Sequence, residues 1–231
     1  MSPTVGAAVA TACTALLLVG LLIGERRHAA RVRYATKPLA SLGFVLVPIF
    51  GGALAPGRDV ALWIEAGLVF GAIGDVLLLS SATAAFAGGL GAFLVGHVAY
   101  VIAFAIQVPP GRWIEGPMPA VILPIAALAV AVVRWLWPHL GSLRGPVLAY
   151  VGVICTMMIG AVACALSKAA PADATTRSLE VAGAALFFAS DLSVARDRFV
   201  AEGFVNRAWG LPAYYAGQLL LAWSIVSGAA R

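Results

Sequence analysis

Two aspartates lie within long apolar stretches of the sequence, where a charged side chain is unusual. Asp75 stands in Gly74-Asp-Val-Leu-Leu-Leu79, and Asp191 ends the stretch Phe187-Phe-Ala-Ser-Asp191. An ionised aspartate at the centre of a membrane-spanning helix costs about 2.5–3.5 kcal/mol on insertion scales, so we expect both to face the protein interior or a wet cavity. Two buried carboxyls can divide the roles of acid and base between them. We therefore expect Asp75 and Asp191 to be catalytic.

Seven further polar residues are expected near the aspartates. Counted at about 1.5 Å per residue from the cytoplasmic end of each span, Asp75 lies about 7 Å deep, Asp191 about 6–10 Å and His97 about 18 Å. Most of these polar residues fall in the inner half of the bilayer, which a random scatter would not favour. We therefore expect a substrate-binding wall that consists of Lys37, His97, Tyr100, Ser190, Tyr214, Tyr215 and Gln218.

Helical spacing relates several of these side chains to one another. Gln218 lies four residues after Tyr214 and three after Tyr215, so it can share a helix face with either tyrosine. Ser190 directly precedes Asp191, so the two point about 100° apart on a helix. We therefore expect Ser190 to line the cavity wall rather than to bind the same target as Asp191.

Each of these residues also has a structural interpretation. Lys37 can extend its ammonium group to the cytoplasmic surface. His97 can be a core histidine bonded to a backbone carbonyl. Tyr214 and Tyr215 can belong to an interfacial aromatic belt. The two aspartates can form a hydrogen-bonded lock with each other or with Lys37, although an acid/base function is the preferred interpretation.

Metal binding and covalent catalysis are less favoured by the sequence. Asp75, His97 and Asp191 offer carboxylate and imidazole groups, but there is no HExxH motif and no histidine pair four residues apart. The other two histidines, His28 and His139, lie in predicted loops. No GxSxG motif and no Cys–His arrangement is present. We therefore expect neither a metal ion nor another cofactor.

Composition places the chain in a membrane. It has 231 residues, of which 62% are hydrophobic and only 11% are charged, and its mean hydropathy is +0.98. The apolar runs are continuous rather than alternating, which favours helices over a β-barrel. We expect one all-α, polytopic transmembrane domain over residues 1–231. Its eight expected spans are residues 4–24, 35–54, 60–80, 85–107, 118–137, 146–167, 178–195 and 208–228.

Lysines and arginines predict the orientation of these spans. Ten lie on one side and five on the other, which places the richer side in the cytoplasm and both termini on the non-cytoplasmic side of the cell membrane. Because these residues lie in short loops, the net charge of +5 does not indicate a nucleic-acid partner. Arg196, Asp197 and Arg198 are expected to form a solvated helix end.

Glycines recur at spacings typical of closely packed membrane helices. Gly67, Gly71 and Gly74 lie in the third expected span, and further glycines cluster early in the fourth. Small residues let helix backbones approach closely. We therefore expect the third and fourth spans to pack tightly against their neighbours.

Five short motifs occur in order between about residues 35 and 222: Lys37-Pro-Leu39, Gly74-Asp-Val-Leu-Leu-Leu79, Gly88-Gly-Leu-Gly-Ala-Phe-Leu-Val-Gly-His-Val-Ala-Tyr100, Phe187-Phe-Ala-Ser-Asp191 and Tyr214-Tyr-Ala-Gly-Gln218. In order and spacing they resemble motifs of the lysoplasmalogenase family of YhhN-like membrane proteins. The resemblance implies an eight-helix membrane enzyme that acts on a lysophospholipid. It implies cleavage of the vinyl ether bond of lysoplasmalogens to a fatty aldehyde and glycerophosphocholine or glycerophosphoethanolamine.

The implied reaction suits two carboxyl groups. The β-carbon of a vinyl ether must be protonated first, water captures the resulting oxocarbenium ion, and the hemiacetal collapses to aldehyde and alcohol. The reaction needs one protonated carboxyl and one carboxylate that stabilises the cation and takes a proton from water. The sequence leaves open which aspartate is the acid. Lys37 either keeps one aspartate ionised or binds the lipid phosphate, and Tyr214, Tyr215 and Gln218 are candidates to hold the water or the glycerol hydroxyl.

Two other classes of function compete with an enzyme. A proton-coupled transporter also uses intramembrane aspartate, histidine and lysine, although the sequence has no visible internal repeat. A structural membrane protein leaves the clustering of ionisable residues in one leaflet unexplained.

Overall fold

Long α-helices dominate the fold. The computed structural model describes residues 3–55, 57–167 and 172–229, and the regular structure in these ranges is entirely helical. Short helical turns at Pro110–Ile114, Trp137–His139 and Gly141–Leu143 join the longer helices, and a π-helical segment, Arg196–Val200, extends α7. The long helices are α1 (Pro3–Arg26), α2 (Ala30–Phe50), α3 (Asp59–Leu77), α4 (Thr83–Gln107), α5 (Met118–Leu136), α6 (Arg144–Leu166), α7 (Ala174–Ala195) and α8 (Phe204–Ala229).

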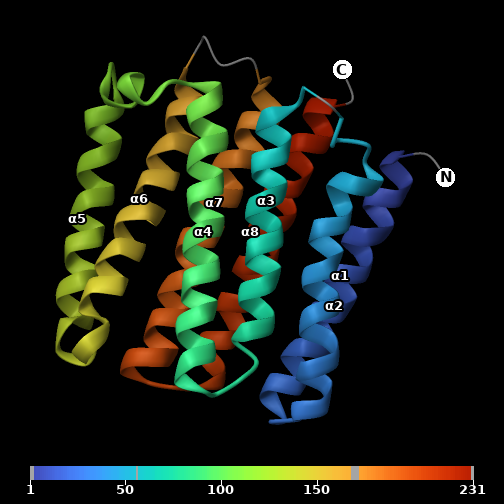
Figure 1. The fold of residues 1–231 in the computed structure, drawn as a ribbon, viewed down its shortest axis with the longest axis vertical. Helices are drawn as coiled ribbons and strands as arrows, with labels where there is room; N and C mark the ends of the chain where they lie inside the picture. The colour runs from blue at the N-terminus through green and yellow to red at the C-terminus, as the bar shows by residue number, and fades with distance from the viewer. Residues whose placement is uncertain (1–2, 56, 168–171, 230–231) are drawn as a thin grey trace.

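The helices form an up-and-down bundle whose members share one approximate axis (Figure 1). Within the described residues, six of them are long and apolar enough to cross a membrane: α1, α3, α4, α5, α6 and α7. A helix satisfies its own backbone hydrogen bonds, which is what a chain inside hydrocarbon requires. The length and composition of these helices agree with a polytopic, all-α integral membrane protein.

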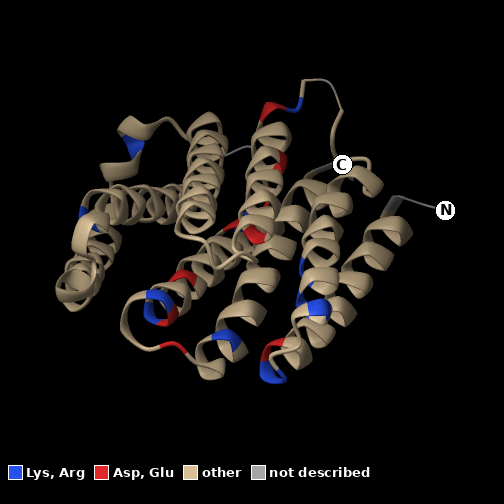
Figure 2. Cartoon of the chain, turned by 60° about the horizontal axis from the view of Figure 1, so that its bottom comes forward, with Lys and Arg blue, Asp and Glu red and all other residues tan. Residues whose placement is uncertain are grey.

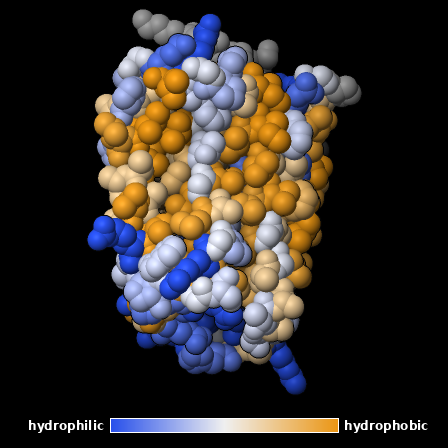
Figure 3. Space-filling view, turned by 60° about the vertical axis from the view of Figure 1, so that its left-hand side comes forward, coloured by the Kyte–Doolittle hydropathy of each residue, from blue (hydrophilic) through white to orange (hydrophobic). Residues whose placement is uncertain are grey.

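The surface and the charges agree with this assignment. Figure 3 shows a broad apolar band between two more hydrophilic ends of the molecule. Charged residues gather at the end that carries the α1–α2, α3–α4 and α7–α8 connections, which comes forward in Figure 2. We call this the charged end; the chain termini lie at the opposite end (Figure 1).

The expected spans and the observed helices differ at their boundaries. Residues 35–54 are the expected second span, but α2 is Ala30–Phe50. Gly52 follows with a φ of 66°, a conformation that glycine adopts without strain and that suits a turn. Residues 178–195 are the expected seventh span, but α7 begins at Ala174 because the Asp173 side chain accepts a hydrogen bond from the Thr176 amide at 2.8 Å.

The glycines of α3 do lie at close helix contacts. A Cβ on Gly67 would lie 2.3 Å from the Tyr100 ring of α4, and one on Gly74 would lie 2.7 Å from Phe93. Non-bonded carbon atoms do not approach so closely, so any residue with a Cβ at these positions would clash with the rings. Only glycine fits without moving them. The expected tight packing of the third span is therefore present.

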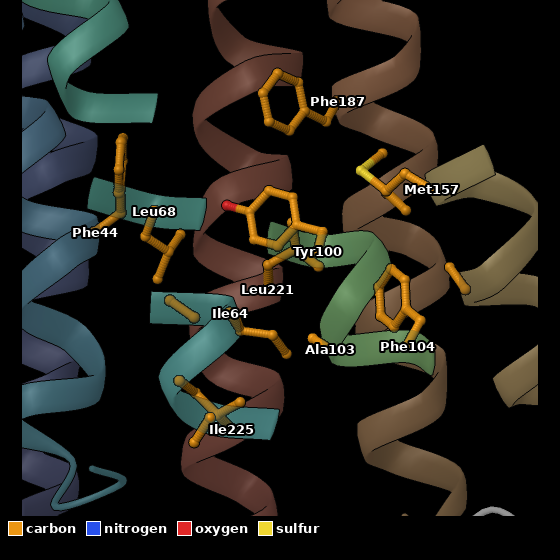
Figure 4. Close-up of a cluster of buried hydrophobic side chains, with 14 of the residues drawn as sticks. Phe44, Ile64, Leu68, Tyr100, Ala103, Phe104, Met157, Phe187, Leu221 and Ile225 are labelled. Carbon is orange, nitrogen blue, oxygen red and sulfur yellow. The ribbon is translucent and has the colours of Figure 1, made fainter. Parts of the chain in front are cut away.

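Large side chains fill the centre of the bundle. Tyr100, Phe104 and Phe187 are fully or almost fully buried, and Figure 4 shows them among residues of α3, α4, α6 and α8. In contrast, α5 packs mainly on α6 and exposes most of its residues. The core therefore lies at the centre of the bundle, and α5 is peripheral to it.

Candidate active site

A cavity of about 680 Å³ enters the bundle from the charged end. Both aspartates line it, Asp75 from α3 and Asp191 from α7. Lys37 of α2, Ser190 of α7 and Tyr214 of α8 also contribute to its wall. Lys37 and Tyr214, which both line this cavity, lie 177 positions apart in the sequence.

Asp75 lies in a charged and hydrogen-bonded environment. Its Oδ1 is 3.2 Å from the Lys37 ammonium nitrogen, and the side chains of both residues are almost fully buried. Its Oδ2 accepts a hydrogen bond of 2.6 Å from the Ser41 hydroxyl. Because Lys37 is a cation and Ser41 donates, this environment stabilises the carboxylate form of Asp75.

The hydrogen bonds around Ser41 extend this arrangement to α8. The Ser41 oxygen lies 3.1 Å from the Tyr215 hydroxyl. The Lys37 carbonyl oxygen is a second acceptor here, 3.0 Å from the Ser41 hydroxyl and 3.3 Å from the Tyr215 hydroxyl. When Ser41 donates its single proton to Asp75, Tyr215 donates to Ser41 or to this carbonyl. Tyr215 thus lies behind Asp75 and joins α8 to the hydrogen bonds around Ser41.

Asp191 lies in a different environment. The Tyr150 hydroxyl of α6 donates to Asp191 Oδ2 at 2.7 Å. Among the residues that the structure describes, neither lysine nor arginine lies within ion-pair distance of Asp191. Asp191 therefore lacks the cation that accompanies Asp75.

His97 of α4 lies beside Asp191. Its Nδ1 is 2.7 Å from the Phe93 carbonyl oxygen, which can only accept, so Nδ1 carries a proton. Its Nε2 is buried without a hydrogen-bond partner in the described chain and lies 3.7 Å from Asp191 Oδ2. In the neutral ring, Nε2 is an acceptor that faces the carboxyl group.

A layer of polar side chains from α4 and α8 lies behind the cavity wall. The Tyr100 hydroxyl donates to Gln218 Oε1 at 2.7 Å, and Gln218 Nε2 donates to the Tyr214 hydroxyl at 3.2 Å. A Cβ on Gly71 would lie 2.4 Å from Gln218 Nε2, so this glycine leaves space for the amide. Through the bond from Gln218, this layer holds the Tyr214 side chain in position, and Tyr214 is the residue of the layer that lines the cavity.

The predicted binding residues thus divide into two groups. Lys37, Ser190 and Tyr214 line the cavity, and Ser190 also donates to the Phe187 carbonyl at 2.7 Å. The other predicted binding residues support the wall from behind and do not line the cavity: His97, Tyr100, Tyr215 and Gln218. Their polar atoms, apart from His97 Nε2, bond to neighbouring protein groups.

Sequence reasoning missed Ser41 and Tyr150, which contact the two aspartates directly. Ser41 lies four residues after Lys37, and that spacing was a signal that both share one face of α2. Tyr150 had no such signal, because a tyrosine near the end of an apolar span looks like a member of an interfacial belt.

The mouth of the cavity carries an ion-pair network. Arg207 of α8 bonds to Glu25 at 2.8 Å, to Asp197 at 3.2 Å and to Glu202 at 2.9 Å. Arg33 also pairs with Glu25, at 2.9 Å. The segment after α7, expected to be a solvated helix end, is therefore partly tied to α8.

The described residues contain no group of three or more histidine, cysteine, aspartate and glutamate side chains that could hold a metal ion. The cavity instead offers two carboxyl groups in unlike surroundings, one lysine and several hydroxyls. These groups can donate and accept protons and can hold a polar molecule.

Comparison with known proteins identifies relatives. The chain is 36% identical over 161 residues to lysoplasmalogenase TMEM86A of Bos taurus, covering 69% of this chain and 63% of that protein. It is 34% identical over 168 residues to a lysoplasmalogenase of Mycobacterium bovis, covering 69% and 58%. It is 30% identical over 200 residues to the membrane protein YhhN of Escherichia coli, covering 84% and 86%. No solved structure matches it significantly.

The matches to the two lysoplasmalogenases span less than two thirds of those proteins. The family match is broader, because it extends over residues 32–225 and so includes both aspartates and the cavity residues Lys37, Ser190 and Tyr214. The chain therefore belongs to the YhhN family.

Proposed function

We propose that the protein is a membrane hydrolase that cleaves the vinyl ether bond of lysoplasmalogens. The observation that carries this proposal is the pair of carboxyl groups on one cavity wall, one beside a lysine and one without a cation. Two relatives are named lysoplasmalogenases, which supports the same reaction. The substrate is a lysophospholipid with an alkenyl chain, and the products are a fatty aldehyde and a glycerophospho-alcohol.

The unlike environments of the two aspartates support a different role for each. Asp75 is the carboxylate, because the Lys37 ammonium group and the Ser41 hydroxyl both stabilise its charge. Asp191 is the acid, because burial without a cation favours its protonated form and His97 Nε2 faces it as an acceptor. The hydrogen bond from Tyr150 holds the Asp191 carboxyl in position.

In the first half of the reaction, Asp191 donates its proton to the β-carbon of the vinyl ether. The carbon–carbon double bond supplies the electron pair, and an oxocarbenium ion forms. Asp75 stabilises this cation and removes a proton from the water that attacks it. The result is a hemiacetal, with Asp191 ionised and Asp75 protonated.

In the second half the roles exchange. Asp75 donates its new proton to the glycerol oxygen as the carbon–oxygen bond breaks, and Asp191 removes the proton of the hemiacetal hydroxyl. The aldehyde and the alcohol leave, and both aspartates return to their starting states. Hydrolysis consumes one water and no net proton, so the cycle needs no external proton source.

The proposal includes a topology. The protein lies in the cell membrane, and all eight helices cross it as one domain. The charged end, which has the excess of lysine and arginine, faces the cytoplasm. The termini are then on the non-cytoplasmic side. The cavity mouth then lies at the cytoplasmic leaflet, and the substrate enters from that leaflet.

Aldehyde release by the purified protein in detergent tests this function. A lysoplasmalogen should yield aldehyde with and without a chelator, whereas the saturated alkyl-ether analogue should yield none. A proton-coupled transporter, the alternative function, would need a sealed vesicle and a gradient. Absence of aldehyde from correctly folded protein would refute the proposed hydrolysis.

A further inference from the structure

Arg198 lies on the cavity wall at the charged end, in the π-helical segment that follows α7. Its guanidinium carbon is 4.2 Å from the centre of the Phe86 ring, which belongs to the first turn of α4. Phe199 packs edge-on against the same ring, with 6.2 Å between the ring centroids. A cation held over an aromatic face keeps its position while its donors stay available.

Arg198 differs in its pairing from the other cations that line the cavity. Arg33 and Arg207 pair with glutamate or aspartate, and Lys37 pairs with Asp75. In the described part of the chain, no carboxylate lies within ion-pair distance of Arg198. Among these four cations, Arg198 is therefore the one that can bind an anion without breaking an existing ion pair.

We propose that Arg198 binds the phosphate of the lysophospholipid substrate; the identity of this lipid rests on the proposed function. Asp191 and Arg198 both line the cavity. Arg198 lies seven residues after Asp191, in the π-helical segment that extends α7, so the two are separated by about 10 Å along the helix. In a lysoplasmalogen, seven covalent bonds separate the reacting β-carbon from the phosphorus, which extend to about 8–9 Å at the per-bond rise of an extended chain. The lipid can thus reach both residues at once.

The apolar part of the cavity wall offers a binding surface for the hydrocarbon chain of the lipid. Leu90 of α4, Val132 of α5, and Val151 and Ile154 of α6 line the wall. Because α5 packs mainly on α6, these helices form an apolar wall near the membrane-facing side of the bundle. The hydrocarbon chain lies against this wall, and the phosphate lies at Arg198.

Binding of lipids that cannot be cleaved tests the phosphate site directly. The probes are a radiolabelled 1-alkyl lysophospholipid and the matching 1-alkylglycerol, which lacks the phosphate. For Arg198→Gln we expect about tenfold weaker binding of the phospholipid, since a hydrogen bond to a charged group is lost. Binding of the alkylglycerol should not change, and Arg198→Lys should restore part of the phospholipid affinity.

Arg144→Gln is the matched control, because Arg144 also lies over an aromatic ring, that of Trp137 at 4.6 Å, but does not line the cavity. This control should bind both probes as the wild type does. Equal binding of the phospholipid by Arg198→Gln and wild type would overturn the site. Equal weakening of both probes would also overturn it, because Arg198 would then support the wall rather than bind phosphate.

These readouts separate the phosphate site from the proposed reaction. If Arg198 is needed for phospholipid binding but the wild type releases no aldehyde, the site stands and the proposed hydrolysis fails. If the wild type releases aldehyde and Arg198→Gln has an unchanged KM for phosphorylated substrate, the reaction stands and the site fails.

Discussion

Lys37 Nζ lies 3.2 Å from Asp75 Oδ1, and both side chains are almost completely removed from the surface. Asp191, on the same cavity, has a tyrosine and a histidine beside it instead of a cation. This asymmetry is the physical basis for assigning the carboxylate role to one aspartate and the acid role to the other.

Asp75→Asn should abolish turnover and also destabilise the protein. Turnover fails because an amide neither stabilises the cation nor takes a proton from water. Stability falls by about 3–5 kcal/mol because Lys37 is left buried without its partner. Aldehyde release and thermal unfolding in detergent measure the two effects.

The double variant Lys37→Met with Asp75→Asn separates those effects. Removal of both charges should restore most of the stability that the single variant loses, because no buried charge is left unpaired. Turnover should remain absent. Recovery of turnover in the double variant would show that Asp75 has only a structural function.

Asp191→Asn should lower kcat by at least about 10²-fold, the usual contribution of a general acid. Its melting temperature should change little, because no buried cation loses a partner and Tyr150 can still donate to the amide oxygen. Binding of the non-cleavable alkyl-ether lipid should persist. Normal turnover would remove Asp191 from the acid role.

Tyr150→Phe should reduce kcat by about tenfold, because the Asp191 carboxyl loses the hydroxyl that orients it. Tyr34→Phe is the control: Tyr34 donates to the Leu79 carbonyl at 3.2 Å but does not line the cavity. Steady-state kinetics should show the lower kcat for Tyr150→Phe and a wild-type kcat for Tyr34→Phe. If the two variants lose activity equally, the effect is not specific to Asp191.

Gly71→Ala should impair activity through the layer behind the wall. The added methyl group meets Gln218 Nε2, so the amide must move and Tyr214 loses its support. Gly91→Ala adds the same group where no atom lies within 4 Å and should have little effect. Activity and melting temperature of the pair measure this difference; equal behaviour would argue against a role for the layer.

The sequence predicted the helical membrane fold, and it singled out the two aspartates as candidates, because both features depend on local composition. Continuous apolar runs indicate spanning helices, and a carboxyl within such a run is conspicuous. The partners of the aspartates were harder to predict, because Ser41 and Tyr150 are ordinary residues for a membrane helix and gain their importance from helix packing. Depth along a span placed His97 among the binding residues, but only the rotation of α4 places it behind the wall, beside Asp191.

The proposed mechanism depends on protonation of the vinyl ether β-carbon by Asp191. Reaction of the purified protein with a lysoplasmalogen in D₂O, followed by mass spectrometry of the aldehyde, measures this step. We predict one deuterium at carbon 2 of the aldehyde from the wild type and from Tyr34→Phe, and no aldehyde above background from Asp191→Asn. Aldehyde without deuterium, or wild-type yields from Asp191→Asn, would contradict the account.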